Sequence, residues 1–564
     1  MKSIQACRQC RRLKRRCDRE KPSCSLCIRL GKGCEYPRNG PTPSDTSVSS
    51  NSNASTHNSP GDLLARLERL EGAISGSMSS GDSVNTPSAL SSFPASFFLD
   101  PDFFVPLQND TAPTTSAAVQ SALSQVLPLI RGDLNSICHS YSVTINQWLS
   151  ILSPQRLFQS ISALKNADLT SKDPALILLL SCLCILVESD YAGPCQEYLL
   201  VKSLSSALEN EGIISFRLLQ ALTMLAVYEL GHGIYPSAYL TIGRAGRLAM
   251  LMGLQDRRVT PHLFKEADTW TLREEERRTW WAIFILDRYC NLTTPGLPLA
   301  IPEPHTSFLL PISDMGWRNG EVRVSPSEPS AVLSALTANP NSIGRFATMC
   351  QASHLMSLVI KHRDSTQPVE EPHLNNTFRL DEALQLHRTL VALDSRITVS
   401  DAGPSSLESS PEQENNLEAL ALICSARCIL YNMYGCNEPD VRSGLDRLRV
   451  ETEIQHESVK GIIDLATKRV PQMAHLVVEI IATATAAGSG AQMGKSISPT
   501  LMHCLYHMAT ECAWFIREGF GPEMTSGLGV IVSALKQMRV SWAVAGECLC
   551  LLTLPSSCFL SSNR

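Results

Sequence analysis

Residues 7–34 read CRQCRRLKRRCDREKPSCSLCIRLGKGC, and the spacing of the cysteines in this stretch decides how the first part of the chain folds. They follow the pattern C-x(2)-C-x(6)-C-x(6)-C-x(2)-C-x(6)-C, at Cys7, Cys10, Cys17, Cys24, Cys27 and Cys34. The second three repeat the spacing of the first three, so the stretch is an internal duplication. A C-x(2)-C pair lets a tight turn bring two thiolates to one tetrahedral zinc ion. The spacing therefore predicts a zinc-binding module.

The number of sulfurs predicts two zinc ions that share ligands. A single four-cysteine zinc site would leave two thiolates unused and would break the duplication. Two tetrahedral ions need eight ligand positions, and six sulfurs fill them only if two sulfurs bridge both ions. The bridging residues should be equivalent in the two halves, and Cys7 and Cys24 are the natural candidates. Because so short a module has almost no apolar core, metal binding must supply its folding free energy, about 10–16 kcal/mol for a structural zinc.

The residues between the cysteines give the two halves different roles. Five of the six residues between Cys10 and Cys17 are basic, whereas those between Cys27 and Cys34 are mostly apolar or glycine. Arginine and lysine in the major groove read guanine, and the remaining positive charges neutralise phosphates. We therefore expect the first half to face DNA and the second half to support it. The candidate DNA contacts are Arg8, Arg11, Arg12, Lys14, Arg15 and Arg16. The alternative is that this basic run is only a nuclear-localisation patch.

Charge is distributed unevenly along the chain. Residues 1–40 contain twelve Lys or Arg and three Asp or Glu, although the 564-residue chain has a net charge of −5. This asymmetry predicts a polyanionic partner for the N-terminal segment.

No signal peptide and no window of about twenty apolar residues is evident, so we expect an intracellular protein with reduced thiols. Disulfides are therefore disfavoured as an explanation of the six cysteines, and the other fourteen cysteines are expected to be core residues.

Composition divides the rest of the chain. We expect a zinc cluster at 1–37, a flexible linker at 38–60, a coiled-coil helix at 61–76, a Ser/Pro-rich linker at 77–116 and an all-α domain at 117–555. Spacings of four, three and four separate Leu63, Leu67, Leu70 and Ile74, which is the a/d rhythm of a dimerisation helix. The alternative is a short amphipathic helix that docks on its own protein. The aromatic and acidic segment Phe97–Val105 is expected to pack on the main domain, or else to be an activation segment.

Helical periodicity dominates residues 117–555. Apolar residues share one face over Phe216–Leu230, and Ala245–Leu254 and Glu275–Leu292 show the same pattern. The apolar run Ala175–Val187 is interpreted as a buried core helix. Loops rich in Pro, Ser or Gly are expected at 293–340, 364–376 and 400–416.

Two signals in this region do not support a catalytic or metal site. Ser489–Ser496 nearly matches a phosphate-binding loop, but Ser489 replaces the first glycine and Pro499 interrupts any following helix. His475 and Glu479 stand one helical turn apart and are interpreted as a surface pair. No nucleophile–base arrangement is recognisable, so we expect no enzyme activity.

The cysteine spacing resembles that of the fungal binuclear zinc cluster transcription factors. This resemblance implies that Cys7 and Cys24 bridge the two zinc ions and that Lys14 reads a CGG triplet. Leu13 stands where the family often has a further basic residue, which leaves the triplet preference open. The family also follows its cluster with a linker and a short coiled coil, which matches residues 38–74.

A second resemblance, to the regulatory domain of the same family, lies in Gly243–Leu254, Glu275–Arg288 and Leu297–Pro302. It implies that the helical domain regulates activity, either through a metabolite or through a partner. Within this region Trp280, Trp281, Phe284 and Ile285 are expected to be core. We expect Arg277, Arg278 and Asp287 to form an ion-pair network on the helix surface, and no ligand site among these residues.

Together these features predict a nuclear, zinc-dependent regulator that binds double-stranded DNA as a homodimer and contacts the transcription machinery. The resemblance suggests an activator of a metabolic gene set, with secondary metabolism among the options. One alternative is a non-specific zinc scaffold that uses its basic patch for nuclear import and its helical domain to bind proteins. Another is an enzyme in the helical domain that is tethered to DNA.

Overall fold

The computed structural model describes the chain in several ranges. These are 17–18, 20–24, 27–28, 34, 116–130, 134–165, 173–188, 195–255, 267–318, 333, 343–365, 372–401, 416–435, 445–486 and 494–553. The chain divides into two compact units, residues 1–86 and residues 87–564. The predicted linkers, the predicted coiled-coil helix at 61–76 and the segment Phe97–Val105 lie outside the described residues.

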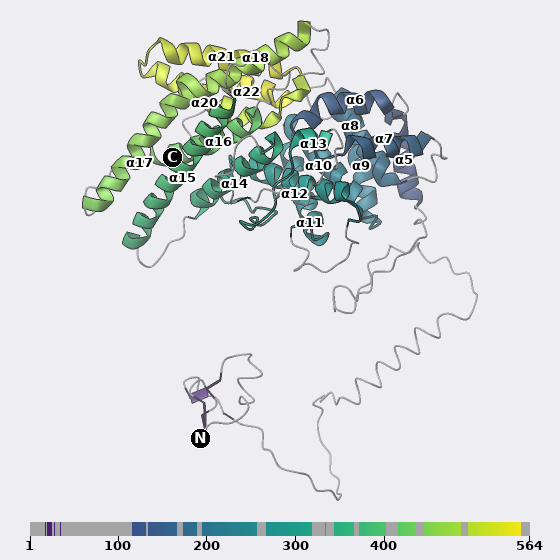
Figure 1. Cartoon of the computed structure of the whole chain (residues 1–564), viewed down its shortest axis with the longest axis horizontal. Coiled ribbons are helices and arrows are strands. Elements are labelled where there is room, and N and C mark those ends of the chain that lie inside the picture. Colours follow the sequence, from purple (N-terminus) through teal and green to yellow (C-terminus); the bar gives the residue numbers. More distant parts are fainter. Residues whose placement is uncertain are drawn as a thin grey trace, which may run out of the picture. The chain divides into compact units, whose positions relative to one another are not determined.

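The described part of the larger unit is built of helices, as its periodicity predicts (Figure 1). They are α5 (Ala117–Ile130), α6 (Leu134–Val143), η2 (Ile145–Gln147), α7 (Pro154–Lys165), α8 (Pro174–Glu188), α9 (Gln196–Asn210), α10 (Phe216–Gly231), α11 (Tyr235–Leu251), α12 (Trp270–Cys290), α13 (Asp314–Arg318), α14 (Arg345–Asp364), α15 (Pro372–Asp401), α16 (Leu417–Tyr434), α17 (Leu445–Asp464), η5 (Leu465–Arg469), α18 (Val470–Ala486), η6 (Gly494–Ser496), η7 (Pro499–Leu501), α20 (Met502–Arg517), α21 (Pro522–Met538) and α22 (Ala543–Thr553). The loops expected at 364–376 and 400–416 coincide with the two breaks in the helices, but α15 begins earlier than expected, at Pro372, and ends at Asp401. Within the expected loop 293–340, the short helix α13 forms.

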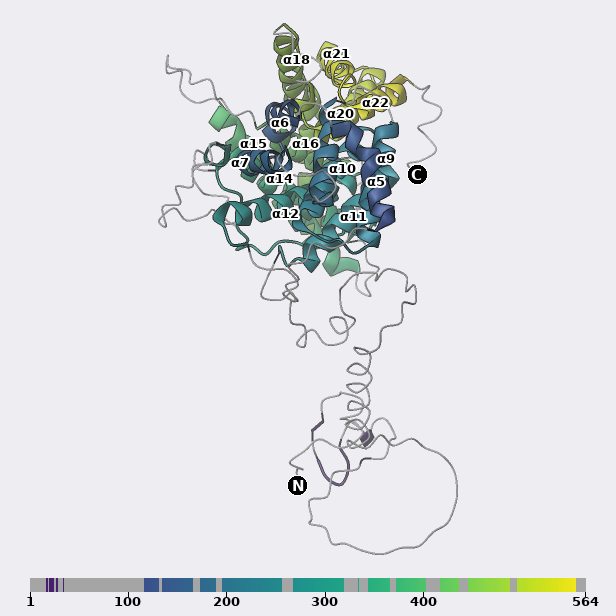
Figure 2. The same cartoon turned by 90° about the vertical axis from the view of Figure 1, so that its right-hand side faces the viewer.

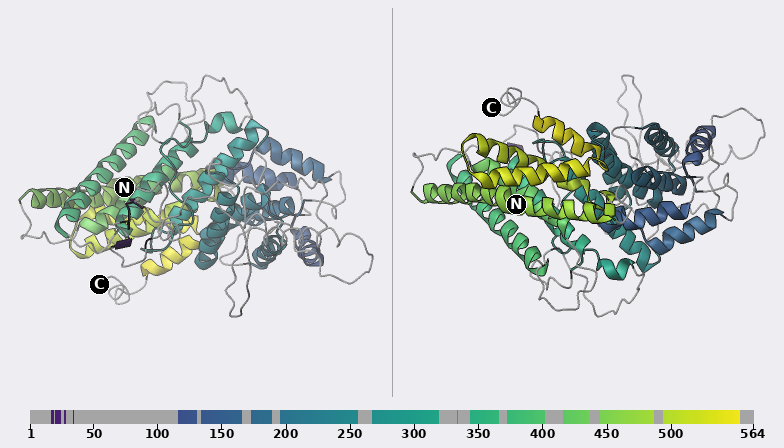
Figure 3. Two further views of the ribbon diagram at one scale, coloured as in Figure 1. Left: turned by 90° about the horizontal axis from the view of Figure 1, so that it is seen from below. Right: turned by 90° about the horizontal axis from the view of Figure 1, so that it is seen from above.

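Helix α14 joins the two ends of the larger unit. It contacts α12 on one side and α15 and α16 on the other. The blue and teal helices of the first half therefore lie at one end of the unit and the green and yellow helices at the other, as Figure 1 and the two views in Figure 3 show. Figure 2 is seen from the end that carries the blue helices. Helix α22 returns from the last part of the chain to contact α10.

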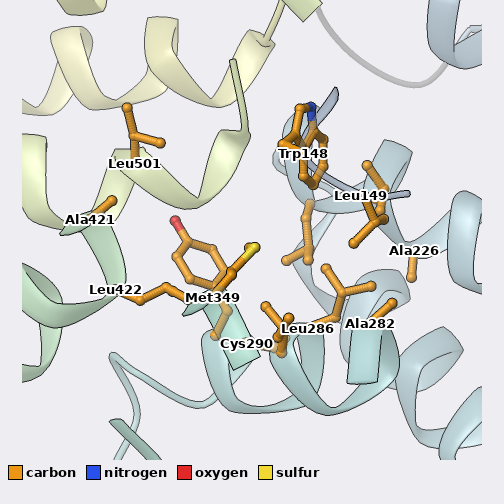
Figure 4. Packing of buried hydrophobic residues seen from close by; sticks show 14 of the residues in the cluster. Trp148, Leu149, Ala226, Ala282, Leu286, Cys290, Met349, Ala421, Leu422 and Leu501 are labelled. Atoms are coloured by element: carbon orange, nitrogen blue, oxygen red, sulfur yellow. The ribbon is translucent and has the colours of Figure 1, made fainter. Parts of the chain in front are cut away.

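One continuous hydrophobic core runs through both halves. Figure 4 shows its middle, where Trp148 and Leu286 from the first half approach Met349 of α14 and Leu422 of α16. All four side chains are buried. Burying a large apolar side chain contributes about 1.5–3 kcal/mol, so this shared core stabilises the two halves together.

The most apolar helices lie at the centre of this core. The prediction of a core helix at Ala175–Val187 is confirmed, because every residue of this run in α8 is buried. Helix α10 begins at an N-cap in which the Ser215 hydroxyl accepts a hydrogen bond from the Leu218 amide, at 3.2 Å. Its residues from Leu218 to Gly231 are all buried, so α10 is enclosed on every side and not only along the predicted apolar face.

One described helix, α16, has the length and apolar composition that a membrane span requires. Within the fold, 83% of this helix is buried. It contacts α14, α15, α17 and α20. Packing inside the protein therefore accounts for its composition.

The aromatic residues of α12 are core residues, as predicted. Trp280, Trp281, Phe284 and Ile285 are all buried. The rings of Trp280 and Trp281 meet edge to face with centroids 5.0 Å apart, and Trp280 stacks on Phe284 at 5.5 Å. These ring contacts stabilise the core in addition to the free energy gained by burying apolar surface.

The prediction that Arg278 lies in a surface network is wrong. Its guanidinium is buried: Nε donates to Glu274 at 3.0 Å, and Nη1 donates to Asp314 at 3.0 Å. Nη2 donates to the carbonyl oxygen of Ile312 at 2.8 Å. Asp314 in turn accepts the Phe346 amide at the start of α14, at 2.9 Å. Arg278 therefore connects α12 with α13, and through Asp314 with α14. Arg277, by contrast, is only partly buried and pairs with Glu274.

Asp287 is buried as well, which is a second correction. It accepts the amides of Ala300, at 3.1 Å, and Ile301, at 3.4 Å. Burial raises the pKa of Asp287, while the charge of Arg288 and these amides oppose the rise. Arg288 donates to Glu303 at 3.0 Å, so two neighbouring residues of α12 hold the segment 298–303, which we call the post-α12 segment.

Gly494–Ser496, the described end of the sequence that nearly matches a phosphate-binding loop, precedes α20 and belongs to a buried connector that continues through Pro499. Three aromatic side chains donate to its carbonyl oxygens: Trp148 to Lys495 at 3.1 Å, Trp542 to Ile497 at 2.8 Å, and Tyr289 to Pro499 at 3.1 Å. Lys495 is buried, and its ammonium lies 5.0 Å from the Trp542 ring centroid. A buried lysine over an indole is not available to a phosphate, which agrees with the argument against a phosphate-binding loop.

The prediction of a surface pair is confirmed, because His475 and Glu479 form an exposed pair on α18, with Nδ1 and Oε1 3.3 Å apart. The prediction of core cysteines is confirmed for ten residues in the described part of the larger unit, namely Cys138, Cys182, Cys184, Cys290, Cys350, Cys424, Cys428, Cys504, Cys512 and Cys548. It is wrong for Cys550, which is exposed, and Cys195 is only partly buried. Burial raises the pKa of the Cys138 and Cys424 thiols to about 12, which keeps them protonated and inert.

Candidate metal centre

The smaller unit brings cysteines of the predicted zinc module together. The Sγ atoms of Cys24, Cys27 and Cys34 all lie within 4.8 Å of one another. Cys24 and Cys27 are buried and Cys34 is partly buried. Since tetrahedral zinc holds sulfurs about 2.3 Å from the ion, three sulfurs this close fit one metal ion.

Cys24 also belongs to a second group of potential ligands. Its Sγ, the Sγ of Cys17 and a carboxylate oxygen of Asp18 lie within 4.8 Å of one another. Cys24 is thus common to both groups, which is the position that a bridging sulfur must occupy. No pattern in the sequence singles out Asp18, because an acidic residue in a basic segment usually faces solvent.

Short local structure directs these sulfurs. The Cys27 amide donates to Sγ of Cys24 at 3.4 Å, and the Cys24 amide donates to Sγ of Cys34 at 3.2 Å. The Ile28 amide donates to the Cys24 carbonyl oxygen at 3.1 Å, which closes a helical turn after Cys24. Amide donors stabilise the thiolate form that binds metal. Because of this turn, the C-x(2)-C spacing places the sulfurs of Cys24 and Cys27 on the same side of the backbone.

The remaining predicted site residues lie outside the described residues. They are the zinc ligands Cys7 and Cys10 and the DNA contacts Arg8, Arg11, Arg12, Lys14, Arg15 and Arg16. The described cysteines fit zinc by chemistry and by separation: thiolates are its preferred ligands, and the group around Cys27 and Cys34 needs only one further ligand from the chain.

The family comparisons agree with this geometry. Residues 5–42 match the fungal Zn(2)-Cys(6) binuclear cluster domain, a zinc-binding domain. Residues 138–334 match the fungal specific transcription factor domain. The second match covers α6 to α12 and the post-α12 segment, which contain the buried arginine networks.

Individual relatives are also named as transcription factors or transcriptional activators. Transcription factor BOA15 of Botryotinia fuckeliana is 32% identical over 149 residues, which are 26% of this chain and 80% of the relative. The citrinin biosynthesis transcriptional activator mrl3 of Monascus ruber is 26% identical over 375 residues, which are 62% of this chain and 72% of the relative. The azaphilone cluster-specific transcription factor azaR of Aspergillus niger is 23% identical over 322 residues, which are 55% of this chain and 62% of the relative.

Proposed function

Because the chain belongs to the fungal Zn(2)-Cys(6) transcription factors, which are DNA-binding regulators, we propose that its six N-terminal cysteines hold two zinc ions and that this cluster presents Lys14 to specific DNA sequences. The observation that carries the proposal is the double membership of Cys24, whose sulfur lies in both groups of potential ligands. A shared sulfur is what two ions with six thiolates require.

Bound zinc would supply the metal–thiolate bonds that give the short module its fold. Cys7 and Cys24 would each bind both ions, and Cys10, Cys17, Cys27 and Cys34 would each bind one. With the module fixed in this way, the basic run between Cys10 and Cys17 has a defined shape. Lys14 then donates to guanine in the major groove, while Arg8, Arg11, Arg12, Arg15 and Arg16 contact phosphates and neighbouring bases.

The protein binds DNA as a homodimer. Leu63, Leu67, Leu70 and Ile74 form the dimer seam, and the linker at 38–60 sets the distance between two CGG-like half-sites. The helical domain that begins near Ala117 then regulates activity and contacts the transcription machinery. Net positive charge in the first forty residues favours a polyanionic partner such as DNA, whose condensed counterions are released when basic side chains neutralise its phosphates.

The target genes encode a metabolic pathway, and secondary metabolism is the best-supported class. Relatives are named as activators of citrinin biosynthesis and as an azaphilone cluster-specific transcription factor. The nucleus is the compartment in which such a protein acts.

The test is selection of DNA by the zinc-loaded full-length protein from a pool of randomised duplexes. We expect enrichment of paired CGG-like triplets at a fixed spacing, and loss of enrichment when a chelator removes zinc. Salt-sensitive binding with no enriched sequence would support the alternative of a non-specific zinc scaffold.

Lys14→Ala and Lys32→Ala form a matched pair for this experiment. Both remove one positive charge from the module, but Lys32 lies in the supporting half. We expect Lys14→Ala to remove the preference for one base at one position of the enriched sequence. The free energy that discriminates the preferred base from the others should fall by about 1–3 kcal/mol. Lys32→Ala should retain the same enriched sequence. Equal loss in both variants would show that charge alone explains the binding.

A further inference from the structure

The helical domain contains a cavity that the DNA-binding role does not use. It has a volume of about 710 Å³ and lies between α10, α11 and the post-α12 segment. Leu218 and Leu222 of α10 line one wall, Leu248 of α11 lines another, and Leu299 and Ala300 lie across from them. This volume and mostly apolar lining are typical of sites for small organic molecules.

One wall of this cavity contains a glycine of α11. Gly243 lies in the interior of α11 and lines the cavity, and a Cβ atom added there would meet no other heavy atom within 4 Å. Glycine in a helix interior destabilises the helix by about 0.5–1 kcal/mol relative to alanine. One turn further along, close packing accounts for the glycine at position 246, because a Cβ atom there would lie 3.1 Å from Ala300 and Ile301. Close packing therefore explains Gly246, but it does not explain Gly243.

Two arginines give the cavity a positive charge. Arg244 and Arg247 lie on the same helix as Gly243 and line the cavity. Arg244 donates to Glu209 at 3.0 Å, and its buried Nε atom has no hydrogen-bond partner within the described residues. Arg247 is exposed, and no hydrogen bond or ion pair of its guanidinium is found in the described part of the chain.

The acidic residues of the lining do not cancel this charge. Glu209 neutralises only one of the two arginines. Asp287 is paired with Arg288 and accepts the amides of Ala300 and Ile301, so it does not compensate for Arg247. The cavity therefore combines apolar walls with one positive charge in excess at its opening, where the Leu240 side chain is 62% exposed.

We propose that this cavity binds a small organic acid. Its apolar body lies against Leu218, Leu222 and the open backbone at Gly243. Its carboxylate pairs with the exposed guanidinium of Arg247. Binding there does not depend on the zinc cluster or on DNA.

The position of the cavity gives such a ligand a structural route to the rest of the domain. Leu299 and Ala300 belong to the post-α12 segment, which Asp287 and Arg288 hold from α12. In the same segment Glu303 accepts a hydrogen bond from His354 of α14 at 3.1 Å. A ligand that contacts Leu299 therefore contacts the segment whose hydrogen bonds connect α12 to α14.

The test is isothermal titration calorimetry of the full-length protein with decanoate and 2-naphthoate, and with decanol and 2-naphthalenemethanol as neutral counterparts. We expect at least one acid to bind, and its alcohol to bind at least tenfold more weakly. Arg247→Gln should weaken binding of the acid about tenfold and leave binding of the alcohol unchanged.

Gly243→Phe and Gly243→Ala form the steric pair. Phenylalanine fills the cavity and should abolish binding, whereas alanine should change the dissociation constant less than threefold. Thermal unfolding of each variant establishes that the fold is intact. No binding of either acid at millimolar concentration, equal binding of acid and alcohol, or unchanged binding by a folded Gly243→Phe protein would each overturn the proposal. None of these results would alter the DNA enrichment that tests the proposed function.

Discussion

Nη1 of Arg278 lies 3.0 Å from Oδ1 of Asp314, and neither side chain reaches solvent. Asp314 lies in α13, a short helix within a stretch that the sequence marks as a loop. Removing Arg278 leaves the buried carboxylate of Asp314 without its guanidinium partner and leaves buried Glu274 with Arg277 alone. We expect Arg278→Ala to lower the free energy of unfolding by about 3–5 kcal/mol, measured by urea denaturation.

An exposed ion pair provides the control for this prediction. Arg388 donates to Glu453 at 2.9 Å, and both side chains are more than one-third exposed. Arg388→Ala should lower the free energy of unfolding by about 0–1 kcal/mol. A loss below about 1 kcal/mol for Arg278→Ala would contradict the importance given to the buried network.

The two glycines of α11 should respond in opposite directions to the same substitution. Gly243→Ala places a methyl group in open space and should raise the free energy of unfolding by about 0.5–1 kcal/mol. Gly246→Ala places a methyl group 3.1 Å from Ala300 and Ile301, so it should lower the free energy of unfolding. Thermal and urea denaturation of both variants measure the difference. If both substitutions raised the free energy of unfolding, the post-α12 segment would be able to move away from the added methyl group at little cost in free energy.

Glu303 should make the helical domain sensitive to acid. Burial by itself would raise the pKa of Glu303, but hydrogen bonds from His354 and Ser357 and the charge of Arg288 outweigh it and lower the pKa to about 2. Lys361 adds a further positive charge 3.5 Å away. The ordinary value is 4.5, so the unfolded state binds the proton first as the pH falls. The contribution of Glu303 to stability is complete above pH 4.5 and is lost between about pH 4.5 and pH 2.

Comparison with Glu303→Gln isolates this contribution from other carboxylates. The difference in free energy of unfolding between the two proteins should shrink as the pH falls through that window, by at most about 3 kcal/mol. Urea denaturation between pH 3 and pH 6 measures it. A difference that stays constant with pH would show that Glu303 has its ordinary pKa in the folded protein.

Zinc content should distinguish a bridging cysteine from a terminal one. We expect native mass spectrometry of the full-length protein to find two zinc ions, Cys34→Ser to retain one of them tightly, and Cys24→Ser to lose both. Cys550→Ser changes an exposed cysteine of α22 and should retain two. One zinc ion in the unsubstituted protein would contradict the shared-ligand arrangement.

The dimer seam has its own pair of variants. Leu67→Asp places a charge on the predicted seam, whereas Ala65→Asp places the same charge on the outward face of the same helix. We expect sedimentation velocity to show a monomer for Leu67→Asp and a dimer for Ala65→Asp. Dimers in both cases would mean that another surface joins the subunits.

Local patterns in the sequence predict the helices and the cysteine cluster, but they miss contacts between distant segments. Trp280 and Trp281 are recognisable as core because they are large and apolar. Arg278 is not, since charged residues on a helix usually face solvent, and its partner Asp314 lies 36 residues away. The cavity cannot be read from the sequence for a similar reason: it forms where the distant post-α12 segment packs on α11 at Gly246, one turn from Gly243.

The connector around Lys495, Ile497 and Pro499 has a consequence for how this protein can be shortened. Its carbonyl oxygens accept hydrogen bonds from Trp148 near the start of the domain, from Tyr289 in the middle and from Trp542 near the end. A polypeptide that stops before Gly494 lacks the acceptors of the Trp148 indole and the Tyr289 phenol. The region matched as the fungal specific transcription factor domain ends at residue 334, and so it is a part of a longer cooperative unit and not a domain that can be excised.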